Sequence, residues 1–386
     1  MGYGKATGQQ IRDHNRRLLL RVVYDGVAMN RAALAQATGL AKPTVSDLVA
    51  ELIAEGLLEE GGRGESTDSG GKRPRLLRFV PEARQVIGVS LDESRALAVL
   101  CNLDGKVIAE HHIDLEDETG DDALIILKEA ANGLVAQLDA PLLCLGVGVP
   151  GIVSSSGGIV RQSAPLGWRD VPLARLLNDA YNVPVHIGNS TELAALAQHT
   201  FVANDGGHNL VILQIGRHLE MGAVLGRGAY HFGRDISSLR VTDSRWADSA
   251  LGISSLQTIL GWASVGQRAG DLKTRPLLVN GKPTYLDIRR RVADGDPAMR
   301  ALCNELAHHL ALLFAWVIGL LRPDHLSLAG PMADLGRSFL DEAARQTQQF
   351  LPPETLQEVN FSLADSTNLS ARGAVARTIE MELGIW

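Results

Sequence analysis

Polar side chains suited to DNA recognition gather near the start of the chain. Residues 42–47 read Lys-Pro-Thr-Val-Ser-Asp, which places a lysine and two hydroxyls at the beginning of a predicted helix. The N-terminal residues of a recognition helix usually meet base edges and phosphates. A basic stretch, Lys72-Arg73-Pro74-Arg75, follows a loop rich in Gly and Ser and can neutralise phosphates. We therefore expect DNA contacts from Arg31, Lys42, Pro43, Thr44, Ser46, Asp47, Lys72, Arg73 and Arg75.

Three short helices would position these residues. Residues 9–25 predict a support helix whose inward face carries Ile11, Leu18, Leu19, Val22 and Val23. Asn30 can cap a second helix with Ala33, Leu34 and Ala37 inward, and Gly39 permits a tight exit. Pro43 suits the first turn of the third helix, where its missing N–H costs nothing. The apolar face of that helix is formed by Val45, Leu48, Val49, Leu52 and Ile53.

A three-helix unit can also be a protein-interaction module, because helix-turn-helix spacing alone matches many unrelated sequences. Glu51 and Glu55 also reduce the positive charge of the third helix. The basic stretch at the position of a wing favours DNA. Residues 1–80 hold 12 Lys and Arg against 9 Asp and Glu, which leaves 25 against 35 for the rest of the chain. Only the N-terminal part is therefore a candidate nucleic-acid surface.

Composition limits the other classes. A chain of 386 residues suggests two or three domains. The three cysteines are scattered singly, so the sequence predicts neither a disulfide framework nor a metal site. The first residues are polar, and no apolar stretch approaches the ~18 residues of a membrane span. We expect a soluble cytoplasmic protein without a membrane partner.

After Pro81 the pattern changes to short apolar strands that alternate with helices, which is typical of α/β domains. The predicted strands are residues 86–91, 96–101, 106–112, 142–149, 185–187, 210–215 and 221–225. The predicted helices are residues 121–138, 191–203, 298–321 and 371–383.

The chain resembles the ROK family of bacterial transcriptional regulators and sugar kinases over nearly its full length. The matching segments are residues 31–46, the wing 69–77, Gly146-Val-Gly-Val-Pro-Gly151, residues 164–173 and Leu320-Leu-Arg-Pro-Asp324. The resemblance implies a winged helix-turn-helix in residues 1–80, followed by an actin-like, sugar-kinase body of the ribonuclease H-like class. Its first α/β lobe would be residues 81–190. Residues 191–386 would form the second lobe and carry an oligomerisation surface, with an effector cleft between the lobes.

Four features that the resemblance implies for kinase activity are missing. Two phosphate loops of the family are replaced by Ser90-Leu-Asp-Glu-Ser94 and Gly216-Arg-His-Leu-Glu-Met221, which bring carboxylates and bulky side chains. The catalytic Asp has become Ser190, and an unassisted serine cannot take the proton of a sugar hydroxyl. The cysteines of the family's zinc site are absent. We expect no catalytic residue, no cofactor and no metal.

Sugar binding is less clearly excluded. Gly151 and Asn189 match the family, whereas Ser190, Asp235 and Ser255 stand at or near positions of its hydroxyl-binding acids, and Ser238 lies near that of the zinc-proximal His. An effector would then contact Gly151, Trp168, Asn189, Ser190, Glu192, Asp235, Ser238 and Ser255. Alternatively, Asn189, Ser190 and Glu192 only cap the following helix. Trp168 either packs a loop or stacks on a sugar, and Arg217 and Glu220 either pair or bind an acidic effector.

These observations predict a DNA-binding transcriptional regulator, a metabolite-responsive repressor of carbohydrate-related genes with an inactive kinase-like body. Its partners would be a palindromic double-stranded operator, a small-molecule effector such as a sugar, and further copies in a homodimer or homotetramer. One alternative is a bifunctional sugar kinase. The other is a regulator whose body binds no small molecule and responds to a protein partner.

Overall fold

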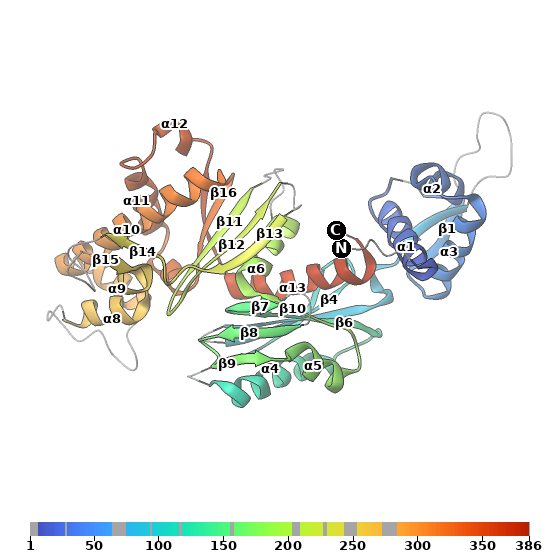
Figure 1. Ribbon diagram of the computed structural model, residues 1–386, viewed down its shortest axis with the longest axis horizontal. Coiled ribbons are helices and arrows are strands. Elements are labelled where there is room, and N and C mark those ends of the chain that lie inside the picture. The colour runs from blue at the N-terminus through green and yellow to red at the C-terminus, as the bar shows by residue number, and fades with distance from the viewer. Residues whose placement is uncertain are drawn as a thin grey trace.

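Three helices and a β-hairpin form the N-terminal unit of the computed structural model (Figure 1). The structure describes residues 7–27, 29–63, 75–92, 95–115, 118–154, 158–202, 209–226, 230–242, 253–271 and 284–385. The elements of the unit are α1 (Gly8–Tyr24), α2 (Arg31–Thr38), α3 (Lys42–Ala54), β1 (Leu58–Arg63) and β2 (Arg75–Phe79). β1 and β2 pair antiparallel, as expected for a wing.

Local sequence explains the helix boundaries. The Asn30 Oδ1 accepts hydrogen bonds from the N–H groups of Ala32 and Ala33 at 3.1 and 3.0 Å, which caps α2. Gly39 ends α2 in the left-handed region at φ 70°, where a side chain would be strained. The unit has a shared apolar core formed by Leu19, Leu20, Val23, Leu34, Val45, Leu48, Val49 and Leu52.

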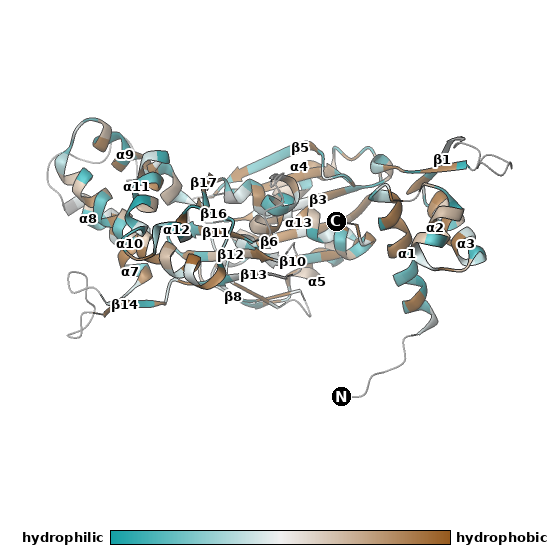
Figure 2. Cartoon of the chain, turned by 90° about the horizontal axis from the view of Figure 1, so that it is seen from above, coloured by the Kyte–Doolittle hydropathy of each residue, from teal (hydrophilic) through white to brown (hydrophobic). Residues whose placement is uncertain are grey.

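Two inward positions expected from helical spacing are wrong. Ile11 is 51% exposed and Ala37 is also exposed, whereas Leu20 belongs to the core. The first turns of α1 project away from the rest of the unit (Figure 2), and residues 8–14 are exposed. Periodicity identified the helix but not where its tertiary contacts begin.

The first lobe of the body is a five-stranded sheet in the order β10-β6-β3-β4-β5. Its strands are β3 (Gln85–Leu91), β4 (Arg95–Asn102), β5 (Val107–Asp114), β6 (Leu142–Val149) and β10 (Val185–Asn189). A 3-10 turn, η1 (Pro81–Ala83), leads into it, and α4 (Gly120–Val135) packs on β3, β4 and β5. A small sheet follows, made of β7 (Ile152–Ser154), β8 (Ile159–Ser163) and β9 (Trp168–Val171), and then α5 (Leu173–Tyr181).

The second lobe repeats this arrangement, with a sheet in the order β13-β12-β11-β16-β17. Its strands are β11 (Leu210–Ile215), β12 (Leu219–Leu225), β13 (Tyr230–Asp235), β16 (His325–Ala329) and β17 (Asn360–Ala364). Around it lie β14 (Arg240–Thr242), β15 (Ile253–Ser255), α7 (Leu256–Leu260), α8 (Trp262–Asp271), α9 (Tyr285–Ala293), α10 (Pro297–Leu321), η3 (Pro331–Leu335), α11 (Arg337–Thr347) and α12 (Pro353–Leu356). In both sheets an antiparallel three-stranded meander is extended by two parallel strands, so the expected two-lobed α/β body is confirmed.

Two helices join the lobes. α6 (Ser190–Ala197), which continues into the π-helical turn η2 (Gln198–Val202), packs against β12 and β13, and it crosses α13 (Ser366–Leu383) closely. α13 packs on β3 and β6 of the first sheet, although it follows the last strand of the second. The chain therefore returns to the first lobe, which departs from the expected assignment of all of residues 191–386 to the second lobe. A Cβ on Gly373 would lie 1.8 Å from the Leu193 carbonyl oxygen, so the crossing requires glycine there.

α10 is long and apolar enough to cross a membrane by length and composition alone. Within the protein, however, 61% of its most apolar window is buried. Leu306, Leu310, Phe314 and Ile318 belong to the core of the second lobe. The composition of α10 is thus that of a core helix.

The winged unit is packed directly onto the first lobe. One continuous apolar cluster contains Leu19 and Leu20 of α1 together with Val375, Ile379 and Leu383 of α13. At the same joint, the Tyr24 hydroxyl hydrogen-bonds to Asp104, and burial raises the pKa of that carboxyl. The DNA-binding unit and the body therefore share buried surface.

Candidate functional site

The outer face of α3 presents most of the residues expected to contact DNA. Lys42, Pro43, Ser46 and Asp47 are exposed, and Thr44 is half-buried. No side chain in the described part of the chain caps the start of α3. Its first N–H groups are therefore open to an anion, and the partial positive charge of the helix end favours one.

The acidic residues of α3 are partly neutralised by α1. Arg12 pairs with Glu51, and Arg16 pairs with Glu55. This arrangement offsets the negative charge that the sequence of α3 carries. The two pairs also fix α1 across α3, so the support helix contributes charge as well as packing.

Two other arginines expected at the DNA are held by one carboxylate. Glu60 of β1 accepts from Arg31 of α2 at 2.6 Å and from Arg75 of β2. The hydrogen bonds from Arg75 and Arg31 lower the pKa of Glu60, and Glu60 raises the pKa of Arg75. Lys72 and Arg73 lie outside the described residues.

Asn189 is buried at the end of β10 and satisfies local backbone groups. Its Oδ1 accepts from the N–H groups of Thr191 and Glu192 at 3.0 and 3.1 Å and from the Thr191 hydroxyl at 2.6 Å. Its Nδ2 donates to the Gly151 carbonyl at 2.8 Å. Helix capping therefore accounts for Asn189, and the same contacts bring Gly151, Asn189, Ser190 and Glu192 together.

Glu220 of β12 has contacts that sequence reasoning did not identify. Its side chain, 4% exposed, accepts from the Gly151 N–H at 2.7 Å and lies 3.5 Å from the Ser190 hydroxyl oxygen. A carboxylate of the second lobe thus reaches the position where the lost catalytic Asp would stand. Spacing along the chain gave no signal of this, because only the packing of β12 against α6 brings residue 220 to Ser190.

A buried hydroxyl lies beside the same seam between the lobes. The Ser163 Oγ has no hydrogen-bond partner within the described residues, and the Ser163 side chain is 1% exposed. A Cβ on Gly151 would lie 2.9 Å from the Ser163 Cα, so the two backbones are in contact. Ser163 was not a candidate in the sequence, where nothing distinguishes it from other serines.

The remaining effector candidates are more scattered. Trp168 is 4% exposed, packs in the core of the first lobe, and its Nε1 donates to the Gly120 carbonyl at 2.8 Å. It therefore packs a loop, and the stacking interpretation of Trp168 is incompatible with this placement. Asp235 at the end of β13 and Ser238 just after it are exposed, and Ser255 caps α7 through the Thr258 N–H at 3.1 Å.

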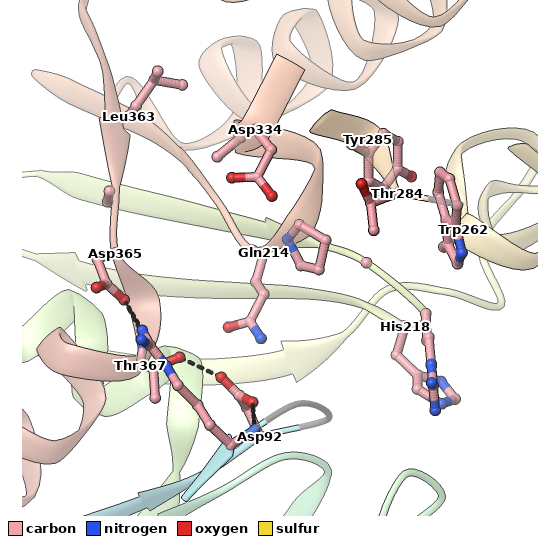
Figure 3. A pocket seen from close by; sticks show the side chains of 17 residues that line it. Asp92, Gln214, His218, Trp262, Thr284, Tyr285, Asp334, Leu363, Asp365 and Thr367 are labelled. Carbon is pink, nitrogen blue, oxygen red and sulfur yellow. Dashed lines mark hydrogen bonds and ion pairs between the residues drawn. The ribbon is translucent and has the colours of Figure 1, made fainter. Parts of the chain in front are cut away.

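A cavity of about 730 Å³ opens where the two expected phosphate loops meet (Figure 3). Asp92 accepts from Thr367 and from the Arg95 N–H, and Arg95 pairs with Asp365 at 2.8 Å. Asp334 lines the opposite wall, and burial raises its pKa. Three carboxylates, Asp92, Asp334 and Asp365, and two arginines, Arg95 and Arg217, therefore line this space in the described part of the chain, and Asp365 already pairs with Arg95. The excess of acids weakens the attraction for a polyphosphate.

This cavity is distinct from the seam at Glu220. None of the predicted effector residues belongs to its described lining. His218 does, and burial lowers the pKa of its imidazole, which favours the neutral ring. No group of three His, Cys, Asp or Glu residues suited to a metal ion occurs in the described ranges.

Known proteins match both parts of this architecture. Residues 86–235 match the ROK family model, and residues 25–62 match the IclR helix-turn-helix domain. The body is therefore similar to the ROK family over residues 86–235. It is 26% identical over 350 residues to the xylose repressor of Caldicellulosiruptor bescii, which covers 85% of this chain and 86% of that protein. It is 24% identical to the N-acetylglucosamine repressor of Escherichia coli O157:H7, over 86% of this chain and 83% of the other.

Solved structures of ROK family proteins share the fold. A ROK family transcriptional regulator, a homologue of the Escherichia coli MLC protein, matches 97% of this chain and 98% of its own with a TM-score of 0.77 and 22% identity. A ROK family glucokinase from Streptomyces griseus, solved with glucose and AMPPNP, matches 76% of this chain and 98% of its own with a TM-score of 0.62 and 18% identity. The ROK regulator thus covers the winged unit as well as the body.

Proposed function

We propose that this protein is a cytoplasmic, DNA-binding transcriptional repressor of carbohydrate-related genes whose kinase-like body senses a metabolite. The outer face of α3, with Lys42, Pro43, Thr44, Ser46 and Asp47, reads the operator. Arg31, Arg75 and the wing residues Lys72 and Arg73 contact phosphates. The observation that carries this proposal is the uncapped, outward-facing start of α3 beside an α1 whose arginines pair with Glu51 and Glu55. Full-length relatives named as repressors support it.

The body works as a sensor and not as an enzyme. Ser190 replaces the general base, and its hydroxyl faces Glu220 in a buried seam. The two phosphate loops carry Asp92 and Arg217 at the cavity instead of open glycine backbone. Since phosphoryl transfer depends on positioning and on stabilising negative charge, these replacements remove its requirements.

The effector is a neutral, hydroxyl-rich compound that binds at the interlobe seam. The Gly151 N–H, the Ser190 hydroxyl and the Glu220 carboxylate converge there, and the backbone of Ser163 is in contact with Gly151. A carboxylate accepts hydrogen bonds from sugar hydroxyls and repels a phosphate group. Opening of the lobes would bring further residues into contact with the effector, namely Glu192, Asp235, Ser238 and Ser255.

Two copies would be needed to read a palindromic operator. Each copy contributes one α3, and half-sites separated by one helical turn of DNA match a two-fold dimer. We therefore infer a homodimer, or a homotetramer built from such dimers. Inserting half a helical turn between the half-sites should abolish cooperative binding, whereas inserting a full turn should retain more of it.

Selection of bound fragments from a genomic pool at ~100 mM salt tests the DNA-binding role. A small set of fragments should be enriched, and their affinity should fall steeply as salt rises, since phosphate contacts release counterions. The variant Lys42→Ala should weaken binding to all fragments alike, because a phosphate contact carries no sequence information. Equal recovery of every fragment by the wild-type protein would contradict the proposal.

Two assays separate the rival functions. Thermal shift with xylose, N-acetylglucosamine, glucose and their phosphates should reveal stabilisation by a neutral sugar, about 2.7 kcal/mol at 100 times its dissociation constant. No shift with any compound would favour a body that responds to a protein partner. ADP release above background with any of these sugars would instead support a bifunctional kinase.

A further inference from the structure

Asp47 differs from the other described carboxylates of the winged unit. Residues 7–79 have six other described carboxylates, and each has a partner. Asp13 accepts from Gln9, Asp25 pairs with Arg21, Glu51 with Arg12, Glu55 with Arg16, Glu59 with Arg78, and Glu60 with Arg31 and Arg75. Asp47 has no hydrogen bond or ion pair to any described residue.

The packing of α3 sets the direction of this carboxylate. Val45, Leu48, Val49 and Leu52 are buried against α1 and α2, which fixes the inner face of the helix. Asp47 lies on the opposite, exposed face, one turn beyond Pro43 and next to Ser46. The side chain therefore points to the surface that meets DNA in the proposed function.

A carboxylate on that surface loses water when the surface meets DNA, and it then needs a hydrogen-bond donor. A phosphate would repel the Asp47 carboxylate, so Asp47 would weaken the binding of a helix that contacted phosphates alone. Over the major groove the carboxylate can accept from an exocyclic amino group, which only cytosine and adenine offer there. The adenine amino group stands between the acceptors N7 of the same base and O4 of its thymine partner, whereas the cytosine amino group has an acceptor on one side only. The second carboxylate oxygen therefore meets less repulsion beside cytosine than beside adenine, which makes cytosine the better partner.

We infer that Asp47 is a specificity-determining residue that accepts a hydrogen bond from the N4 amino group of a cytosine in each operator half-site. This inference rests on the proposed function and deepens it, because it assigns one base to one residue. Guanine and thymine present acceptors at the same place and are excluded by repulsion. The pairing of Glu51 and Glu55 with α1 leaves Asp47 as the carboxylate of α3 that is free to read a base.

Selection from a randomised duplex library, with the full-length protein, tests the assignment. The wild type should select cytosine at one position in each half-site. Asp47→Ala should lose the preference at that position alone, so the discrimination between cytosine and the other bases falls from roughly 5- to 150-fold to within about twofold. Asp47→Asn should move the preference towards adenine, because an amide matches the N6 and N7 pattern of that base. Glu51→Gln is the matched control, since it removes the same charge one turn along α3 and should leave every base preference unchanged.

The outcomes separate this inference from the proposed function. If the wild type selects a sequence and Asp47→Ala selects the same one, the assignment to Asp47 is overturned while DNA binding stands. Two further results overturn the assignment to Asp47. In one, folded Asp47→Ala loses its base preference at all positions. In the other, the wild type prefers adenine at the affected position. If the wild type selects nothing, the proposed function itself fails. Circular dichroism of the variants checks folding, which an exposed, unpartnered side chain should not affect.

Discussion

At the scale of single residues, Glu220 changes the interpretation of the body. In the sequence it is one more carboxylate in a lost phosphate loop; in the fold it accepts from Gly151 and stands beside Ser190. Because Gly151 lies in the first lobe and Glu220 in the second, one buried hydrogen bond links the two. In the proposed function an effector hydroxyl competes for these groups, which would connect effector binding with lobe movement at this residue.

Replacing Glu220 should therefore destabilise the folded protein, by an amount that depends on whether the new side chain can accept a hydrogen bond. Glu220→Ala leaves the Gly151 N–H without its acceptor and should reduce the free energy of unfolding by about 1–3 kcal/mol. Glu220→Gln keeps an acceptor and should cost less than the alanine variant. Urea denaturation measures both, with exposed Glu358→Ala as a control expected to stay within about 0.5 kcal/mol of the wild type. Equal stability of Glu220→Ala and the wild type would show that the seam is not closed by this residue.

Glu382 of α13 provides a pH-dependent contact beneath the DNA-binding unit. The hydrogen bond with His186, at 2.7 Å, is the main cause of the lowered pKa of Glu382, and the charges of His186 and Arg17 of α1 add to it. A carboxyl with a lowered pKa in the folded state stabilises above its unfolded value, ordinarily 4.5, and loses that contribution as the pH falls through the folded value.

The difference in unfolding free energy between the wild type and Glu382→Gln should consequently shrink as the pH falls below 4.5. Denaturant titrations at a series of pH values below about pH 5 measure it, with Glu358→Gln as the charge-matched control. A difference that grows on acidification below pH 4.5 would contradict the assigned direction of the shift.

At the scale of elements, the features that depend on neighbouring residues, namely helix ends and strongly apolar strands, were mostly predicted from capping signals and periodicity. Asn30, Gly39 and Pro43 bound α2 and α3 because caps and turns depend on neighbouring residues. Runs of apolar residues likewise indicated the central strands of both sheets. The small sheet β7-β8-β9 and the strands β16 and β17 were not predicted, since short or mixed strands have no distinctive period.

The part of the site that depends on tertiary packing could not be predicted. Asn189 and Gly151 were identified from their motifs, and in the fold the Asn189 Nδ2 donates to the Gly151 carbonyl at 2.8 Å. Glu220 was left between a pair with Arg217 and contact with an acidic effector, because only the packing of β12 against α6 brings it to Ser190. Ser163 was not identified, because nothing in the sequence distinguishes it from other serines. Trp168 was left between two interpretations, which only its burial could separate.

The crossing of α6 and α13 is the element contact most sensitive to side-chain size. Gly373→Ala would bring a methyl group to the Leu193 carbonyl and should cost about 1–3 kcal/mol or prevent folding. Gly319→Ala is the matched control, because Gly319 is also helical and a Cβ there meets nothing within 4 Å. It should stabilise by about 0.5–1 kcal/mol. Thermal unfolding of the two variants should therefore shift in opposite directions, and a shared direction would contradict the packing account.

At the scale of the whole molecule, the winged unit is connected to the sensor through α13. That helix packs on the first sheet, crosses α6 beside Asn189, and ends in the apolar cluster that contains Leu19 and Leu20 of α1. A change in the angle between the lobes would therefore move the surface on which the DNA-binding unit rests. An effector can act in this way only if it binds one lobe arrangement better than the other.

The most direct test is the affinity of the full-length protein for its selected operator, measured by fluorescence anisotropy at constant salt with and without the sugar that gives the largest thermal shift. The account predicts a change in the dissociation constant of roughly 5- to 150-fold at saturating sugar, the usual range of coupling between two sites. It further predicts that a scrambled duplex binds weakly in both conditions. An operator affinity that stays within twofold while the sugar demonstrably binds would contradict the claim that the body is the sensor and the winged unit its output.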